Sequence, residues 1–508
     1  MDFYRKLSQI GKLDMLYYDS NFVFPNFIKE KEVLDAFEDI IKNNRKTLIY
    51  RDYDMDGAMA GECIKETFNL LGYENYEVYE YSSRTHKVDP SAVTKAIVEH
   101  FDYIIILDAG SGEPDVMFRL MNMGVKVILL DHHQSIYGYE DFSGVKMINT
   151  SFDNRTRDDQ INISAGALTY LVCEKLITRF GKKPYKPLAA LALVSLYADA
   201  IDMSSSLCRS IYYKAMELDE SQLPRIIQRF MNNYSSFTRR FIEYHMSPKI
   251  NSLFRSESFD LLNRLLGWNP RSGIGIASLM ESVNSVYEKY RAEVYKASDL
   301  IEVKLMDNFV IGNLSSVAEY VDIPTEKLHN YTGLVANQLA SKYQRTAVVW
   351  ADSGVDIKGS LRDLHGRNYL DLFRQFSKAE GHNSAFGIRI PYRDLEEFIR
   401  YVDLIDKQFT TKIENEPIII SHNYKEPDTS LMADIAKYNE FSGISTPIAL
   451  VSKMWLDRVN ARFTGYYYKV RWGKLYIKSR NRIRIGSELI LKPYRGWDVE
   501  LEVIEIGG

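Results

Sequence analysis

The sequence is poor in cysteine and has no long hydrophobic run, and each absence excludes a class of protein. The 3 cysteines among 508 residues form no C-x-x-C pair, which argues against a disulfide framework and against a zinc knuckle. No stretch approaches the roughly 18 consecutive apolar residues that a membrane helix needs. The first residues also lack the apolar segment of a signal peptide. We therefore expect a cytoplasmic protein that makes no contact with membranes.

Charge of one sign is also missing, since 64 Lys and Arg stand against 68 Asp and Glu. The net charge of −4 favours no class of partner, although local patches can still bind polyanions. The hydrophobic content of 45% is ordinary for a globular chain and excludes a disordered or collagen-like protein.

Three short apolar runs predict buried parallel strands in the first part of the chain. The runs are TLIY (47–50), YIIIL (103–107) and VKVILL (125–130), and each is too short for a buried helix. Helical patterns lie between or beside them, which is typical of an α/β layer with a parallel sheet. In such sheets, ligands bind outside the carboxyl ends of the strands.

The whole chain predicts an α/β fold in four parts. Residues 1–205 form the parallel-sheet domain, and residues 206–300 form a helical connector. Residues 301–404 carry a second α/β pattern. Residues 405–508 are rich in short strands with glycine-containing turns, which indicates a small β-barrel or sandwich.

Acidic and imidazole side chains follow each of the predicted strands, and one more aspartate follows a later apolar run. In chain order they are Asp52, Asp54, Asp56, Asp108, Asp131, His132, His133 and Asp199. Taken singly, an aspartate after a strand is more often a turn residue or a helix cap. If the strands are neighbours, however, the carboxylates meet at one edge and repel one another unless they hold cations. Such ligands suit Mn²⁺ or Mg²⁺, and a pair of ions can clamp a phosphate.

The ordered motifs DYDMDG, DAG, DHH and a late AD resemble those of the DHH phosphoesterase superfamily. Further segments are similar to the RecJ-type single-strand-specific exonucleases, namely PKINSLFR (248–255), IKGSLRD (357–363), EGHNSAFG (380–387) and, more weakly, ADIAKYNEFSGISTPI (433–448). The resemblance implies a DHH domain, a DHH-associated domain and a C-terminal OB-like nucleic-acid-binding domain. The chain departs from the pattern at Glu380 and around Ser195, where the family usually has glycine, and in the last segment, which has lost its proline.

The resemblance also implies a role for each acidic or imidazole residue. Two divalent ions, Mn²⁺ preferred and Mg²⁺ as the alternative, would be held by Asp52, Asp54, Asp56, Asp108, His132 and Asp199. Asp108 would bridge the ions, and His133 would face the scissile phosphate. Asp131 would orient an imidazole, a common supporting role. The nucleophile would be a hydroxide activated by the two metals.

Substrate-binding residues follow from the same likeness, and the motifs that carry them supply Arg84, Asn251, Arg255, Ser360, Arg362, Gly381 and His382. Arg362 offers a bidentate fork for phosphate, although an ordinary ion pair is the alternative. For Asn251 and Arg255 the alternative is packing between the two lobes. Ser164-Ala165-Gly166 either presents N–H groups to an anion or only caps a helix.

The C-terminal part carries a basic, aromatic stretch at residues 461–485 with no Asp or Glu. The cations that we assign to a nucleic-acid platform are Lys469, Arg471, Lys474, Lys478, Arg480, Arg482 and Arg484. Interleaved cations and aromatic rings are typical of surfaces that bind single strands. The alternative is a solvated basic face over an aromatic core.

The favoured function is a metal-dependent exonuclease that hydrolyses phosphodiester bonds of single-stranded DNA, with 5′-to-3′ polarity implied by the resemblance. DNA is favoured over RNA, and the likeness implies roles in DNA repair and recombination; any repair or replication partner is undetermined. The alternatives are an oligoribonuclease or a phosphodiesterase of linear or cyclic dinucleotides. A non-catalytic replication scaffold is less favoured, because the ligands are intact.

Overall fold

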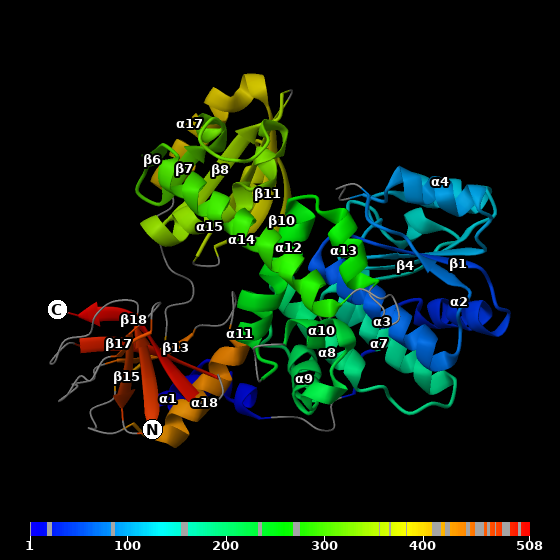
Figure 1. Cartoon of the computed structure of the whole chain (residues 1–508), viewed down its shortest axis with the longest axis horizontal. Coiled ribbons are helices and arrows are strands. Elements are labelled where there is room, and N and C mark those ends of the chain that lie inside the picture. Colours follow the sequence, from blue (N-terminus) through cyan, green and yellow to red (C-terminus); the bar gives the residue numbers. More distant parts are fainter. Residues whose placement is uncertain are drawn as a thin grey trace. The chain divides into compact units, whose positions relative to one another are not determined.

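The chain forms a mixed α/β protein that divides into two compact units (Figure 1). In this computed structural model the described residues are 2–17, 23–82, 87–153, 161–231, 236–267, 275–354, 356–364, 367–382, 384–408, 418–421, 427–442, 448–452, 462–464, 468–472, 474–479, 488–495 and 499–507. One unit contains Met1–Met280, Pro417–Gly443 and Ile448–Gly508, and the other contains Glu281–Glu416 and Ile444–Pro447. The α/β fold class predicted from the sequence is confirmed.

The first unit is built on a five-stranded sheet in the order β2-β1-β3-β4-β5. Its strands are β1 (Thr47–Arg51), β2 (Tyr76–Val78), β3 (Tyr103–Leu107), β4 (Lys126–Asp131) and β5 (Lys146–Asn149). All neighbours pair in parallel, so the three strands predicted from apolar runs are confirmed as adjacent. Their residues are almost wholly buried, as expected for a parallel sheet that is covered on both faces.

Helices cover both faces of this sheet (Figure 1). On one face, α4 (Pro90–Val98) and α5 (Pro114–Asn122) share a core with alternate residues of β1, β3 and β4. On the other face lie α2 (Glu30–Lys42), α3 (Met55–Leu71) and α7 (Ala165–Arg179). Helix α8 (Pro187–Ala198) is apolar on all sides and packs against α3 and α7, which explains why nearly all of it is buried.

Short helices make up most of the region predicted as a helical connector. They are α9 (Ser206–Met216), η3 (Glu220–Gln222), α10 (Arg225–Phe230), α11 (Arg239–Phe241), the π-helical turn η4 (Ile242–Met246), α12 (Ser247–Arg255) and α13 (Phe259–Leu266). Further short elements of the first unit are η1 (Leu13–Leu16), η2 (Tyr139–Phe142) and α6 (Thr150–Asp153).

The second unit contains a six-stranded mixed sheet in the order β10-β11-β9-β8-β7-β6. The strands are β6 (Val303–Leu305), β7 (Phe309–Asn313), β8 (Thr346–Asp352), β9 (Asp356–Arg362), β10 (Lys378–His382) and β11 (Ala385–Pro391). The helices are α14 (Ile276–Leu300), η6 (Leu314–Val317), η7 (Thr325–Asn330), α15 (Thr332–Tyr343), α16 (Leu370–Arg374), η8 (Tyr392–Asp394) and α17 (Leu395–Gln408). Helices α14 and α15 pack on one face and α16 and α17 on the other.

The C-terminal residues form a seven-stranded sheet in the order β12-β13-β17-β18-β16-β15-β14, with one helix, α18 (Thr429–Phe441). The strands are β12 (Ile418–Ser421), β13 (Ala449–Ser452), β14 (Arg462–Phe463), β15 (Tyr468–Trp472), β16 (Leu475–Ser479), β17 (Glu488–Arg495) and β18 (Val499–Gly507). The predicted strand-rich region is therefore present. Its OB-like character and the four domain boundaries stay predictions.

The N-terminal helix α1 (Asp2–Gln9) packs against this C-terminal part. Phe3 meets Tyr438 of α18 edge to face at 5.9 Å between ring centroids, and Lys6 Nζ donates to the Ile419 carbonyl at 2.7 Å. Tyr4 donates a hydrogen bond to Asp434. Within the described part of the chain, no helix combines the length and the apolar character that crossing a bilayer requires.

A buried carboxylate fixes the turn between β6 and β7, and its removal gives a first prediction. Asp406 of α17 accepts hydrogen bonds from the N–H groups of Asp307, Asn308 and Phe309 at 3.0, 2.6 and 3.1 Å. Because Asp406→Ala leaves these donors without their acceptor, amide hydrogen exchange over residues 306–310 should accelerate about tenfold or more. The matched control is Asp403→Ala on the same helix, which removes only an exposed ion pair with Lys304. Equal exchange in the two variants would contradict the prediction.

Candidate metal centre

The sheet brings the predicted acidic residues to one edge because β1, β3 and β4 end in register. The Asp52 N–H donates to the Leu107 carbonyl at 3.0 Å, and the Asp108 N–H donates to the Leu130 carbonyl at 2.9 Å. Asp108 has a φ of +62°, in the left-handed region that aspartate, asparagine and glycine tolerate best. The carboxyl ends of three neighbouring strands therefore present their aspartates to one site.

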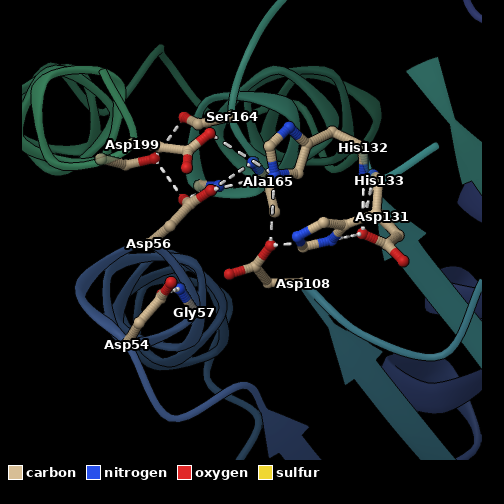
Figure 2. Close-up of polar contacts among 12 residues, drawn as sticks. Asp54, Asp56, Gly57, Asp108, Asp131, His132, His133, Ser164, Ala165 and Asp199 are labelled. Atoms are coloured by element: carbon tan, nitrogen blue, oxygen red, sulfur yellow. Dashed lines mark hydrogen bonds and ion pairs between the residues drawn. The ribbon is translucent and has the colours of Figure 1, made fainter. Parts of the chain in front are cut away.

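Three overlapping groups of ligand atoms form at this edge, and Figure 2 labels every residue of the two groups that share His132. They are Asp108 with His132 and His133, Asp56 with His132 and Asp199, and Asp52 with Asp54 and Asp108; within each group, one ligand atom per residue lies within 4.8 Å of the others. His132 Nε2 lies 3.4 Å from Asp108, 3.6 Å from Asp199 and 3.7 Å from Asp56. Asp108 and His132 each belong to two groups, so the site is continuous.

The amino-terminal end of α7 holds Asp56. The N–H groups of Ala165 and Gly166 donate to the Asp56 carboxylate at 2.8 and 2.7 Å, and the Ser195 hydroxyl donates to it as well. Ser164 is the N-cap residue of α7, and its hydroxyl accepts from Ala167 N at 3.4 Å. The segment therefore caps a helix, and the N–H groups of Ala165 and Gly166 are not free for a ligand, because they donate to the Asp56 carboxylate.

Asp131 lies outside the three groups and positions His133. Its carboxylate accepts from the Ser111 N–H and hydroxyl at 3.2 and 2.5 Å and from the N–H groups of His132 and His133 at 2.7 and 3.2 Å. His133 Nδ1 lies 2.8 Å from the same carboxylate. The ring of His133 is therefore oriented with Nε2 as its remaining polar atom.

The sequence interpretation missed Ser111 and Asn149, which complete this support. Asn149 Nδ2 donates to the Ser111 hydroxyl at 2.6 Å and to the His133 carbonyl at 3.1 Å. Ser111 follows the DAG motif directly, and Asn149 pairs with Asp131 across β4 and β5. These residues carry no pattern of their own in a single sequence, because β5 was not predicted.

The electrostatics of the site fit bound cations. Desolvation is the largest cause that raises the pKa of Asp52, Asp54, Asp56 and Asp108, and the neighbouring carboxylates add to it. Both carboxylate oxygens of Asp108 and Oδ1 of Asp52 are buried and find no hydrogen-bond donor among the described residues. Clustered carboxylates that the protein leaves without donors are the oxygen ligands that Mn²⁺ and Mg²⁺ prefer.

The two residues of the Asp131–His133 pair shift each other's titration. Desolvation lowers the pKa of His133, but the charge of Asp131 and its hydrogen bond outweigh this and raise it to about 10. Burial raises the pKa of Asp131, and His133 outweighs that effect and holds it below its usual range. The pair is therefore a carboxylate and an imidazolium at neutral pH.

The predicted substrate-binding residues fall in several places. Asn251 and Arg255 lie half-buried on α12 of the first unit, while Ser360 and Arg362 lie on β9 of the second. The structure places Arg362 against the amino-terminal turn of α15, since a Cβ at Gly333 would lie 2.8 Å from its Nη2. The Ser360 hydroxyl meets that of Thr332 at 3.0 Å.

Gly381 and His382 both lie on β10. Gly381 has a φ of +138°, and a Cβ there would lie 2.8 Å from Phe386 Cα, so glycine is required on packing grounds as well. The side chain of His382 and the whole of Arg84 lie outside the described residues.

The predicted nucleic-acid platform is in part a sheet face. Lys469 and Arg471 on β15 alternate with the buried Val470 and Trp472, so cations and apolar residues lie on opposite faces. Lys469 Nζ lies 4.0 Å above the ring of the exposed Tyr476. Lys474 is exposed before β16, and Lys478 on β16 is paired with Glu500 at 2.6 Å. Arg480, Arg482 and Arg484 lie outside the described residues.

The DHH family, N-terminal domain, matches residues 46–196. YorK of Bacillus subtilis (strain 168), an SPbeta prophage-derived protein provisionally named as a single-strand DNA-specific exonuclease, is 22% identical over 389 residues, which cover 70% of this chain and 65% of YorK. The single-stranded-DNA-specific exonuclease RecJ of the same strain is 20% identical over 399 residues, which cover 75% of this chain and 48% of RecJ. The chain thus spans less than two thirds of the length of these curated relatives.

The fold is similar to that of RecJ from Thermus thermophilus. The structure with Mn²⁺ gives a TM-score of 0.73 at 15% identity, covering 96% of this chain and 73% of that one. The structure with Mg²⁺ gives 0.65 at 14% identity, covering 97% and 72%. The family match, the relatives and the fold thus agree with the resemblance to RecJ-type DHH proteins that the ordered motifs indicated.

Replacement of Asp108 by asparagine separates stability from metal binding. Asparagine tolerates the left-handed backbone as well as aspartate does, so Asp108→Asn changes the charge and leaves the conformation. Because one repelling carboxylate is lost, the thermal unfolding midpoint of the metal-free protein should rise by about 2–4 °C. The same variant should lose most of the stabilisation that Mn²⁺ gives the wild type, as differential scanning fluorimetry can measure. A lower midpoint without metal would contradict this account.

The metal-free protein should lose stability as the pH rises above the ordinary carboxyl pKa of 3.8 and on toward about 10. The four carboxyls ionise near 3.8 in the unfolded chain but hold their protons to higher pH when folded, so the folded state binds more protons above that value. His133 acts in the same direction between its ordinary pKa of 6.5 and about 10. Asp131 acts oppositely, but only at acid pH below this window. The free energy of unfolding, measured with urea in EDTA at several pH values, should fall with pH less steeply in Asp108→Asn than in the wild type. An equal pH dependence in the two proteins would refute the assignment.

Proposed function

We propose that this protein is a metal-dependent phosphodiesterase that shortens single-stranded DNA. The observation that carries the proposal is the continuous cluster of acidic and imidazole ligands at the carboxyl edge of the parallel sheet, in which Asp108 and His132 are each shared between two groups. The names of the relatives, as exonucleases specific for single-stranded DNA, support the choice of substrate. The protein thus belongs, in this proposal, to the hydrolases that act on ester bonds.

The residues that would hold two divalent ions are Asp52, Asp54, Asp56, Asp108, His132 and Asp199. Asp108 is the candidate for a bridging carboxylate, because it belongs to two of the three groups and neither of its oxygens has a hydrogen-bond donor among the described residues. Ions bound there would lower the pKa of a bound water toward neutrality, which favours hydroxide as the nucleophile. They would also offset the negative charge of a phosphate. Manganese is our preferred ion, with magnesium as the alternative, since RecJ structures with Mn²⁺ and with Mg²⁺ share the fold.

His133 would contact the phosphate through Nε2. Its Nδ1 is engaged by Asp131, and its side chain is 55% exposed, so Nε2 is the atom that can reach a ligand. Asp131 raises the pKa of this ring, which favours the protonated form that donates a charged hydrogen bond to a phosphate oxygen. Asp131 would hold the ring in that orientation.

The proposed substrate length is argued from the C-terminal sheet, and the proposed direction of cleavage from the likeness to RecJ. The face of β15 with Lys469 and Arg471, beside the exposed Tyr476, suits a strand of several nucleotides better than a dinucleotide, because a dinucleotide needs no extended surface. We therefore place the oligoribonucleases and dinucleotide phosphodiesterases second. A scaffold without catalysis is disfavoured, since each position proposed to bind metal carries an aspartate or a histidine. Polarity from 5′ to 3′ follows the RecJ likeness.

The test is a time course with 5′-phosphorylated, 3′-labelled single-stranded DNA and Mn²⁺ on a denaturing gel. The wild type should give a ladder of progressively shorter labelled products. Asp108→Asn should slow cleavage at least about 100-fold, since even residues that only support metal ligands cost 10–100-fold. Ser298→Ala, a buried serine on α14 of the other unit, is the matched control.

Other outcomes would change the proposal in defined ways. Immediate release of a labelled mononucleotide would reverse the polarity. An uncut strand under conditions where the protein binds Mn²⁺ would refute the DNA substrate and favour short RNAs or dinucleotides. Equal rates for the wild type and Asp108→Asn would refute the metal site.

A further inference from the structure

A chain of two hydroxyl groups is hydrogen-bonded to the Asp56 carboxylate. The Ser195 hydroxyl of α8 is within hydrogen-bond distance of both Asp56 Oδ1 and the Ser164 hydroxyl. Both serines are completely buried. The Ser164 hydroxyl in turn lies 3.4 Å from Ala167 N in the first turn of α7. Two helices and one acidic side chain are thus joined by hydrogen bonds that water does not reach.

The direction of these hydrogen bonds follows from counting protons. With a cation bound, the carboxylate of Asp56 is ionised and has no proton to give, so the single proton of Ser195 goes to Asp56. Ser195 must then accept from Ser164, whose oxygen accepts from the N–H group of Ala167. The chain runs from the amino-terminal turn of α7 through Ser164 and Ser195 to Asp56, and each bond polarises the next.

The same counting shows which oxygen of Asp56 stays available. Gly166 N and Ser195 both donate to Oδ1, while Ala165 N donates to Oδ2. Each carboxylate oxygen has two lone pairs, so Oδ1 is saturated and Oδ2 keeps one. Oδ2 is also the atom that lies 3.7 Å from His132 Nε2, inside the group that Asp56 forms with His132 and Asp199.

The side chain of Ser195 packs closely against Gly166. A Cβ built on Gly166 would lie 2.6 Å from the Ser195 oxygen and 2.7 Å from its Cβ, so the two residues are in close contact. Glycine at 166 therefore makes room for a serine at 195. The position of Ser195 is also one where this chain departs from the glycine expected near its fourth motif.

We propose that Ser195, which accepts a hydrogen bond from Ser164 and donates one to Asp56, is a positioning residue. It fixes the Asp56 carboxylate so that this carboxylate binds a divalent ion through Oδ2 alone. The inference rests on the proposed function only in taking Asp56 as a metal ligand. The hydroxyl occupies the second lone pair of Oδ1 and prevents the carboxylate from rotating into a bidentate arrangement. Loss of the hydroxyl frees Oδ1 and loosens the ligand.

The experiment measures Mn²⁺ affinity directly, from the electron paramagnetic resonance signal of free Mn²⁺ titrated with the whole chain. Ser195→Ala and Ser195→Gly should each weaken binding about tenfold, as loss of a residue that supports a metal ligand does. Ser164→Ala keeps the donor to Asp56 and should have a smaller effect. Ser298→Ala, whose hydroxyl donates to the Val294 carbonyl at 2.7 Å in the other unit, should match the wild type.

A merely structural role would lower the unfolding midpoint without changing Mn²⁺ affinity, so circular dichroism of each metal-free variant accompanies the titration. If Ser195→Ala failed to fold, Ser195→Gly and Ser164→Ala would still decide the question. Unchanged affinity in the folded Ser195 variants, or a loss in Ser195→Gly but not in Ser195→Ala, would overturn the inference.

The test also separates this inference from the proposed reaction. If the wild type binds Mn²⁺, the Ser195 variants bind it more weakly, and no DNA is cut, the inference is supported and the proposed reaction alone fails. If the wild type binds no Mn²⁺, both the inference and the proposed metal site are overturned.

Discussion

Mutual repulsion among carboxylates at the end of a parallel sheet is the constraint on which the rest of this structure depends. Three adjacent strands end together, so their aspartates are forced into one desolvated place, where the pKa of four of them rises. Burying such charges without compensation costs on the order of several kcal/mol each. The fold must therefore supply donors, and the way in which it distributes them defines the site.

The donors are distributed unequally. Asp56 receives two backbone N–H groups and a hydroxyl, and Asp131 receives four donors besides an imidazole. Asp108 receives none among the described residues and also occupies an unfavourable backbone region. Strain and unmet charge thus coincide at one residue, which is typical of functional positions that the surrounding structure holds in place. The protein thus supplies donors to Asp56 and Asp131 and leaves the oxygens of Asp108 to a ligand.

Much of this could be predicted from the sequence, because apolar runs and the residues that follow them are local signals. The strands at 47–50, 103–107 and 125–130 and the meeting of their acidic ends needed only periodicity and the rule that parallel strands end at one edge. The anchoring of Asp56 by Gly166 could not be predicted, since it joins segments 110 residues apart. The left-handed backbone of Asp108 and the packing of α1 on α18 depend likewise on tertiary contacts that no local pattern encodes.

The packing of α1 against α18 has a consequence for synthesis on the ribosome. Tyr4 and Asp434 are 430 residues apart in sequence, and Phe3 and Leu7 of α1 are fully buried in the finished protein. At ribosomal speeds of about 5–20 residues per second, α1 waits roughly 20–90 s for its partner. During that interval its apolar side is open to chaperones or to neighbouring nascent chains. Helix α1 is thus made first but is among the last elements to reach its final contacts.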